Sequence, residues 1–260
     1  PIFADVDAET LTLSPQALSQ KITKKTKAIV VVHYVGVPTD MDPIMEIAES
    51  KGLIVIEDAS HSHGVEYKGK KVGSIGNIAA FSCQYHKLIT GGEGGVVTTN
   101  DPELYERAVR FHDHGSLRDG PDPHLFLGYN YRMTELQGAI LVEQLKKLPT
   151  LIKRLDENIQ PLLRAQDELD GIRLISASAG AKRVWYQVLL RLNQKRASNK
   201  EKLIKAMAAE GTPVGAIGPL IYELPVFKDQ NTFLRCKCPF DCPLYGKKVD
   251  YAKHRCPEAE

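Results

Sequence analysis

The sequence lacks the features by which membrane-spanning and nucleic-acid-binding proteins are usually recognised. Its longest apolar runs, such as 28–32 and 53–56, are strand-sized and fall far short of the ~18 residues that a membrane-spanning helix needs. No basic-then-apolar leader opens the sequence, so we expect a cytoplasmic protein. Neither charge sign dominates, because 34 Lys and Arg stand against 32 Asp and Glu, a net charge of +2. This balance argues against a nucleic-acid partner.

Cysteine is also scarce, since the chain has only five. Without a leader, an odd number of cysteines is more typical of reduced thiols than of a disulfide framework. A structural zinc module is an alternative, with Cys236, Cys238, Cys242 and Cys256 as ligands. Their C-x-C spacing differs from the usual C-x2–4-C pattern, so we expect no metal site.

What the first half does contain is an alternation of strand-like and helix-like segments. A capping residue followed by proline predicts helices from Ser14-Pro15, from Asp42-Pro43 to Gly52, and from Asp101-Pro102 to about Phe111. Strands are predicted over 28–33, 53–58, 79–83 and 95–99. The alternation predicts an α/β fold, with a mostly parallel sheet and helices on both faces.

The second half has fewer clear signals. Thr134 and Gln137 form a capping-box pattern ahead of a helix that Pro149 should kink or interrupt. The remaining predictions are a second helical stretch to about residue 169 and a strand over 183–192. A capping box at Ser198–Glu201 also predicts a helix that ends at Gly211. We therefore expect a large domain over 1–150, a helical connector over 151–170, and a smaller α+β domain over 171–260.

Two segments carry candidate chemistry. Asp58 ends a predicted strand, where an acid either caps the following turn or faces a ligand cation. Lys87 lies between two apolar strands, ahead of a glycine-rich stretch that fits neither a phosphate-binding P-loop nor a dinucleotide fingerprint. Partial burial would favour a neutral amine suited to Schiff-base chemistry. Pyridoxal phosphate needs such a lysine, a carboxylate for its ring nitrogen, and polar donors for its phosphate.

The order of these motifs resembles the DegT/StrS-type sugar aminotransferases, which are fold-type-I enzymes that use pyridoxal phosphate. The resemblance extends over nearly the whole chain. It rests on the segments 5–7, 26–29, 57–64, 67–76, 81–87, 92–95, 128–133, 242–243 and 256–260.

The resemblance implies a role for several residues around the cofactor. Lys87 would bond the cofactor aldehyde and later move a proton, Asp58 would pair with the ring nitrogen, and His61 would contact the phenolic oxygen. Ser82 would bind the phosphate, and Gln84 would lie nearby.

Two further residues receive roles by resemblance. Asn130 would reach the cofactor phosphate of a partner subunit, so a homodimer with shared active sites is implied. Arg132 would bind the carboxylate of the amino donor, since its guanidinium matches a carboxylate bidentately. A structural salt bridge is the alternative for Arg132.

The implied reaction is a ping-pong transfer from glutamate or glutamine to a keto-sugar nucleotide or a keto-cyclitol. One branch of the family replaces the lysine with histidine and acts as a dehydratase; Lys87 disfavours that branch, although His86 is adjacent. A cofactor-binding regulatory protein is another alternative. Family members extend beyond both ends of this sequence, so we expect a central part of a longer protein that, alone, binds cofactor poorly and is inactive.

Overall fold

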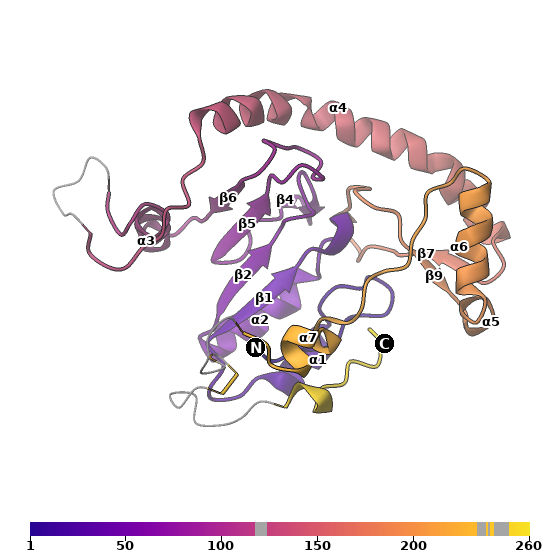
Figure 1. Cartoon of the computed structure of the whole chain (residues 1–260), viewed down its shortest axis with the longest axis horizontal. Helices are drawn as coiled ribbons and strands as arrows, with labels where there is room; N and C mark the ends of the chain where they lie inside the picture. The colour runs from indigo at the N-terminus through magenta and orange to yellow at the C-terminus, as the bar shows by residue number, and fades with distance from the viewer. Residues whose placement is uncertain (118–123, 233–237, 239, 242–249) are drawn as a thin grey trace.

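A four-stranded sheet forms the centre of the fold (Figure 1). The computed structural model describes residues 1–117, 124–232, 238, 240–241 and 250–260. The strands follow the order β1 (Ala28–Val32), β2 (Ile54–Asp58), β5 (Ile78–Ser82) and β6 (Gly95–Thr98). The first three run parallel, and β6 pairs antiparallel with β5. The expected α/β fold with a mostly parallel sheet is confirmed.

Two short helices cover one face of this sheet. The first, α1 (Pro15–Lys21), is capped by Ser14, whose hydroxyl accepts a hydrogen bond from the Ala17 N–H. The second, α2 (Met41–Lys51), ends as predicted at Gly52, which has φ +62°. Its N-cap is Asp40, so the expected start at Asp42 is wrong by two residues. Neither the Asp40 nor the Asp42 carboxylate caps the helix. Asp40 instead accepts a hydrogen bond from the Tyr67 hydroxyl, and Asp42 accepts one from the Lys68 amine.

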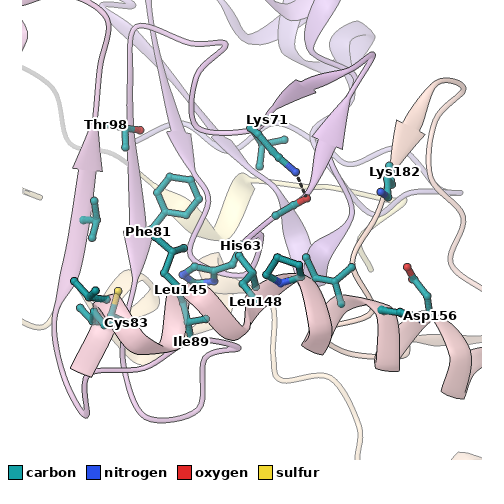
Figure 2. A pocket seen from close by; sticks show the side chains of 18 of the residues that line it. His63, Lys71, Phe81, Cys83, Ile89, Thr98, Leu145, Leu148, Asp156 and Lys182 are labelled. Carbon is teal, nitrogen blue, oxygen red and sulfur yellow. Dashed lines mark hydrogen bonds between the residues drawn. The ribbon is translucent and has the colours of Figure 1, made fainter. Parts of the chain in front are cut away.

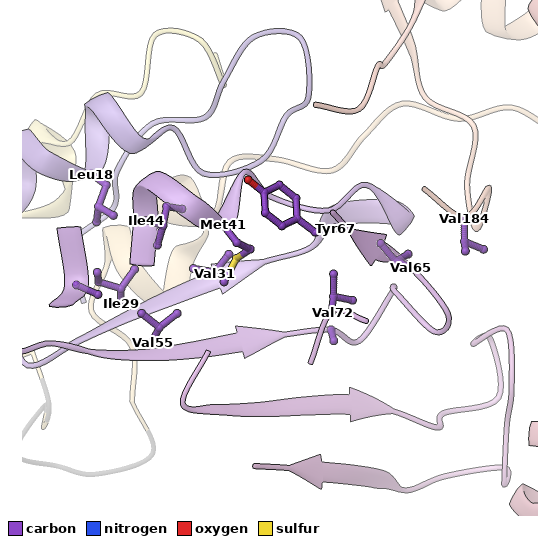
Figure 3. Close-up of a cluster of buried hydrophobic side chains, with 12 residues drawn as sticks. Leu18, Ile29, Val31, Met41, Ile44, Val55, Val65, Tyr67, Val72 and Val184 are labelled. Carbon is purple, nitrogen blue, oxygen red and sulfur yellow. The ribbon is translucent and has the colours of Figure 1, made fainter. Parts of the chain in front are cut away.

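The core lies between these helices and the sheet. Figure 3 shows Leu18 and Ile44 from the helices against Ile29, Val31 and Val55 from the strands. Alternate strand residues point to the opposite face, where Val30, for example, is 58% exposed. Val32, Ile54 and Val97 are exposed there as well. The sheet therefore presents apolar side chains on the face that α1 and α2 do not cover.

The longest helix, α4 (Glu135–Ala165), crosses above the sheet (Figure 1). Its capping box of Thr134 and Gln137 is formed as predicted. The helix continues through Pro149, so the expected interruption there is wrong. A proline removes one helical hydrogen bond, but Ile152 and Leu155 on the following turns pack against the core. This burial keeps the helical direction past the proline.

Residues 183–192 do not form the single strand that was expected. Within this range only β9 (Leu190–Leu192) belongs to a sheet; β8 (Ala181–Lys182) lies just before it, and the two strands pair with different partners. Val184 between them enters the main core, whereas Leu189 packs with a second cluster around Ile175. Since the apolar residues of this segment serve two separate cores, one continuous strand is excluded.

The helix expected from the capping box at Ser198 begins later. It is α6 (Lys200–Ala209), and its N-cap, Asn199, makes no side-chain capping bond. The Ser198 hydroxyl instead donates to the Lys195 carbonyl. The helix stops just before Gly211, close to the expected end. The division into domains at 150 and 170 stays a prediction, and α4 runs through residue 150.

The remaining elements are short. They are η1 (Tyr34–Gly36), β3 (Glu66–Tyr67), β4 (Lys70–Lys71), α3 (Pro102–His112), η2 (Gln166–Glu168), β7 (Ile172–Leu174), α5 (Gln194–Ala197), η3 (Ile221–Glu223), α7 (Pro225–Lys228) and η4 (Tyr251–Lys253).

Gly36 brings a distant segment to the end of β1. Its φ is +84°, and a Cβ there would lie 1.9 Å from the Val184 carbonyl oxygen. The Val184 N–H also donates to the Gly36 carbonyl, at 3.0 Å. Only glycine allows this close approach of two backbones, so position 36 fixes where residues 184–186 lie.

We expect Gly36→Ala to destabilise the protein by more than Gly52→Ala. Alanine at Gly52 meets open space and suffers only the left-handed backbone conformation, a cost of roughly 1–2 kcal/mol. Alanine at Gly36 adds a backbone collision. Chemical denaturation of both variants measures the difference, and equal losses of unfolding free energy would contradict the close packing at Gly36.

Candidate functional site

Asp58 and His61 lie where β2 gives way to a loop. The Asp58 Oδ1 accepts a hydrogen bond from the Ser60 N–H at 3.0 Å, so this side chain does cap the turn. In the described part of the chain, the turn uses only Oδ1 of Asp58, so Oδ2 remains available to a ligand. The two interpretations of Asp58 are therefore compatible. Further along the loop, the buried Ser62 hydroxyl donates to the His33 carbonyl at 2.8 Å.

Lys87 lies in the loop that joins β5 to β6, and it is half-buried. Its N–H donates to the Gln84 carbonyl at 2.9 Å, which closes a turn. The Gln84 Oε1 accepts from the His86 N–H at 2.9 Å, and the Ser82 hydroxyl accepts weakly from the Gln84 N–H at 3.4 Å. The side chains of Ser82 and Gln84 thus support the turn that presents Lys87.

The glycine-rich stretch closes the far side of the same loop. The Gly91 N–H donates to the Cys83 carbonyl, and the Cys83 N–H donates to the Gly94 carbonyl. Gly94 has φ +131°, which only glycine adopts readily. The Gln137 side chain at the start of α4 donates to the Glu93 carbonyl at 3.0 Å. The stretch therefore ties the lysine loop to α4.

Asp58 and Lys87 both interact electrostatically with His61. Burial and the positive charge of Lys87 lower the pKa of His61, while the negative charge of Asp58 opposes them. Burial and Lys87 also lower the pKa of His63, to about 4, so this imidazole is neutral at physiological pH. The His61 Nδ1 is buried without a hydrogen-bond partner among the described residues. The site thus contains an acid, an amine and a neutral ring nitrogen that can bind a ligand.

An aromatic residue from the second half of the chain completes this cluster. The ring of Tyr186 stacks on His61, with centroids 5.0 Å apart, and the tilted ring of Tyr34 lies 6.0 Å from the His61 ring. Lys87 Nζ lies 5.8 Å from the centre of the Tyr186 ring. Tyr186 was not predicted from the sequence, because no local motif marks a residue about a hundred positions from the lysine.

Asn130 and Arg132 lie on the segment just before α4. The Arg132 Nε donates to the Asn130 Oδ1 at 3.0 Å and lies 3.4 Å from Asp113. Asn130 also forms a backbone bridge with Asp113. In the described residues, these bonds join the two side chains to each other and to Asp113 rather than to Asp58 or Lys87. The structural salt bridge considered for Arg132 is thus present.

A buried carboxylate lies directly behind Asp58. Glu57 and His33 are both 0% exposed, and the His33 Nε2 is 2.9 Å from the Glu57 Oε2. The Thr39 N–H donates to the His33 Nδ1, so Nε2 carries the proton and donates to Glu57. A glutamate inside an apolar strand was the signal available in the sequence.

The loop before β5 surrounds the same carboxylate. The N–H groups of Gly73, Ile75 and Gly76 donate to Glu57 at 2.7, 2.8 and 2.6 Å. Burial alone would raise the pKa of Glu57, but the hydrogen bonds from His33, Gly73 and Gly76 outweigh it and hold the pKa below its usual range. The carboxylate is therefore charged and fully bonded.

A cavity of about 970 Å³ lies between α4 and the sheet. Figure 2 shows Leu145 and Leu148 of α4 on one side, with Phe81 and Cys83 on the other. His63 lines the cavity, but Asp58, His61 and Lys87 do not. It is mainly apolar and lies beside the candidate site rather than forming it.

The alternative zinc module lies partly outside the described residues, because Cys236 and Cys242 belong to segments that are not described. In the described ranges, no group of three or more His, Cys, Asp or Glu could hold a metal ion. No helix there has the length and apolarity needed to span a bilayer.

Comparison with known proteins places this geometry in a family. The profile of the DegT/DnrJ/EryC1/StrS aminotransferase family matches residues 1–247. The chain belongs to this family. The resemblance inferred from the motifs is thereby confirmed, and so is the fold-type-I architecture, which solved aminotransferases share with this DegT/StrS-family chain.

Three similar proteins illustrate the range of the family. GDP-perosamine synthase of Escherichia coli O157:H7 is 45% identical over 175 residues, which are 65% of this chain and 48% of that protein. L-glutamine:2-deoxy-scyllo-inosose aminotransferase of Streptomyces fradiae is 37% identical over 203 residues, 74% of this chain and 48% of that protein. The solved aminotransferase from Psychrobacter cryohalolentis has a TM-score of 0.81 at 32% identity, covering 88% and 64%.

The chain spans only part of its relatives. It covers between 48% and 66% of the length of the curated proteins it matches.

The buried carboxylate gives a test of how the site is supported. We expect Glu57→Gln to lower the free energy of unfolding at pH 7 by at least about 2 kcal/mol, because an amide NH2 would face buried N–H donors, each costing roughly 1–3 kcal/mol when unsatisfied. Chemical denaturation measures this loss. Glu46→Gln, on the exposed side of α2, is the control and should change stability by less than about 0.5 kcal/mol.

The effect of Glu57→Gln on the free energy of unfolding should also depend on pH. Because the pKa of Glu57 is lowered on folding, its stabilisation is fully present above the ordinary carboxyl pKa and is lost as pH falls through the lowered value. The stability gap between the parent protein and Glu57→Gln should therefore narrow on acidification below about pH 4. A gap that stays constant down to pH 3 would contradict a charged Glu57.

Proposed function

We propose that this chain carries the cofactor-binding centre of a pyridoxal-phosphate-dependent aminotransferase that acts on sugars or cyclitols. The observation that carries the proposal is the approach of Asp58, His61 and Lys87 at the carboxyl ends of β2 and β5, within a member of an aminotransferase family. In parallel sheets, ligands bind at this edge.

The residues at this edge fit the cofactor. The buried His61 Nδ1, whose ring feels the charges of both Asp58 and Lys87, has no hydrogen-bond partner among the described residues. Asp58 is suited to a protonated ring nitrogen, and Ser82, with Gln84 next along the loop, offers polar groups for a phosphate. Bound pyridoxal phosphate supplies an aldehyde for amines and a ring that withdraws electrons from the reacting carbon.

Each side chain then has a distinct task. Lys87 Nζ would bond the aldehyde carbon with loss of water and, once an incoming amine has displaced it, would take up and return a proton during transfer. Asp58 keeps a proton on the ring nitrogen through its charge. His61, neutral through burial and the charge of Lys87, orients the ring by a hydrogen bond rather than by charge.

Asn130 and Arg132 are proposed to act at a shared interface. Their bonds to each other and to Asp113 fix them on one loop. In a homodimer, Asn130 would reach the cofactor phosphate of the partner subunit, and Arg132 would bind the carboxylate of the amino donor. The exposed rings of Tyr129 and Tyr131, which stack 5.0 Å apart on the same loop, support an interface in this region.

The proposed reaction transfers the amino group of glutamate or glutamine to a keto-sugar nucleotide or a keto-cyclitol. Two of the similar proteins bear names that agree with this reaction, one as the synthase of a GDP-linked sugar and one as an aminotransferase for L-glutamine and an inosose. Lysine at position 87 favours amino transfer over the dehydratase alternative, since that branch has histidine at the equivalent place.

Replacement of Lys87 tests the proposal. With the protein expressed together with any flanking sequence that its gene encodes, we expect borohydride reduction to fix pyridoxal phosphate on the Lys87 peptide. Lys87→Ala should lose this label and at least about 1,000-fold in transamination rate, because it lacks both the covalent link and the proton carrier. Peptide mass spectrometry and amination of keto-sugar and inosose substrates measure the two effects.

The matched control is Lys70→Ala, on the exposed strand β4, which should keep both label and activity. Labelling of the parent protein at another lysine, or equal labelling of Lys87→Ala, would refute the proposal. Labelling without amination of any keto substrate would favour the regulatory alternative.

A further inference from the structure

Tyr186 is the one described residue from beyond α4 whose ring contacts both His61 and Lys87. Its hydroxyl also donates to the His86 carbonyl at 3.2 Å, next to Lys87 in the chain. A single side chain thus contacts the backbone of the lysine loop, the lysine amine and the neighbouring imidazole.

The backbone that carries Tyr186 is firmly held. β8 pairs antiparallel with β3, which fixes residues 181 and 182. Val184 is buried, and its N–H donates to the Gly36 carbonyl after the end of β1. Tyr186 is two residues further, and its Cβ would be 3.5 Å from a Cβ at position 36. The position of the ring is therefore set by the core rather than by a mobile loop.

The chemistry of these contacts favours order at Lys87. Burial raises the pKa of Tyr186, so the hydroxyl remains a donor to the His86 carbonyl at physiological pH. An ammonium group near the face of an aromatic ring is attracted to it. The stack with Tyr186 and the tilted contact with Tyr34 hold the His61 imidazole in one orientation.

We propose that Tyr186 is a positioning residue for Lys87. Its hydroxyl fixes the 84–87 turn through the His86 carbonyl, and its ring confines the lysine amine beside His61. This inference rests on the proposed function, in which Lys87 bonds the cofactor. It predicts that Tyr186 governs the capture of the cofactor aldehyde more than the binding of the rest of the cofactor.

Two cofactor forms separate these effects. Pyridoxal phosphate binds and also bonds to Lys87, whereas pyridoxamine phosphate has no aldehyde and binds without that bond. The rate of pyridoxal phosphate capture by cofactor-free protein and the Kd of pyridoxamine phosphate are measured for the parent, Tyr186→Phe and Tyr186→Leu. Tyr105→Leu, at an exposed position of α3, is the control.

We expect Tyr186→Leu to slow capture about tenfold, since both the ring contact and the hydroxyl bond are lost. Tyr186→Phe should slow it about threefold, because only one hydrogen bond is lost. The Kd of pyridoxamine phosphate should stay within about twofold of the parent value in both variants, since the residues proposed to bind the ring nitrogen and the phosphate are unchanged. Tyr105→Leu should match the parent.

A second readout needs no cofactor. Amide hydrogen exchange over residues 84–91 should be faster in Tyr186→Phe than in the parent, because the turn loses its hydroxyl anchor. Unchanged capture and unchanged exchange in Tyr186→Leu would overturn the inference and leave the proposed function standing. An equal loss for both cofactor forms would show a general packing role and would also overturn it. A parent protein that captures no pyridoxal phosphate on Lys87 would overturn both.

Discussion

The charged carboxylate of Glu57, buried with no exposed surface, is the constraint around which the site edge of the sheet is organised. A buried charge is tolerated only when it is fully hydrogen-bonded. Glu57 meets this need by gathering His33 from the end of β1 and three backbone N–H groups from the loop before β5. The carboxyl ends of β1 and β2 are thereby fixed against the loop that leads into β5, next to Asp58.

The rest of the site builds outward from this point. Ser62 bonds to the His33 carbonyl and so ties the loop after Asp58 to the same network. The lysine loop is closed by its own turn and by the glycine-rich stretch, which α4 holds through Gln137. Gly36 then lets residues 184–186 approach the end of β1. Three distant parts of the chain thus meet around His61 and Lys87.

The secondary structure of the first half could be predicted closely because its signals are local. Caps at Ser14 and Asp101, the left-handed Gly52 and the apolar strands all appear within a residue or two of their expected places. The errors arose where packing overrides local preference. Pro149 stays within α4 because neighbouring turns are buried, and residues 183–192 divide because their apolar side chains enter two cores.

The sequence by itself determined the family, the α/β alternation and the candidates Asp58 and Lys87, since linked motifs and strand ends can be recognised from neighbouring residues. Only the tertiary structure decided which side chains lie together. It joined Tyr186 to Lys87 and His33 to Glu57, and it grouped Asn130 and Arg132 with Asp113. The physical reason is that contacts between distant segments depend on how the cores pack, and no short stretch of sequence encodes that packing.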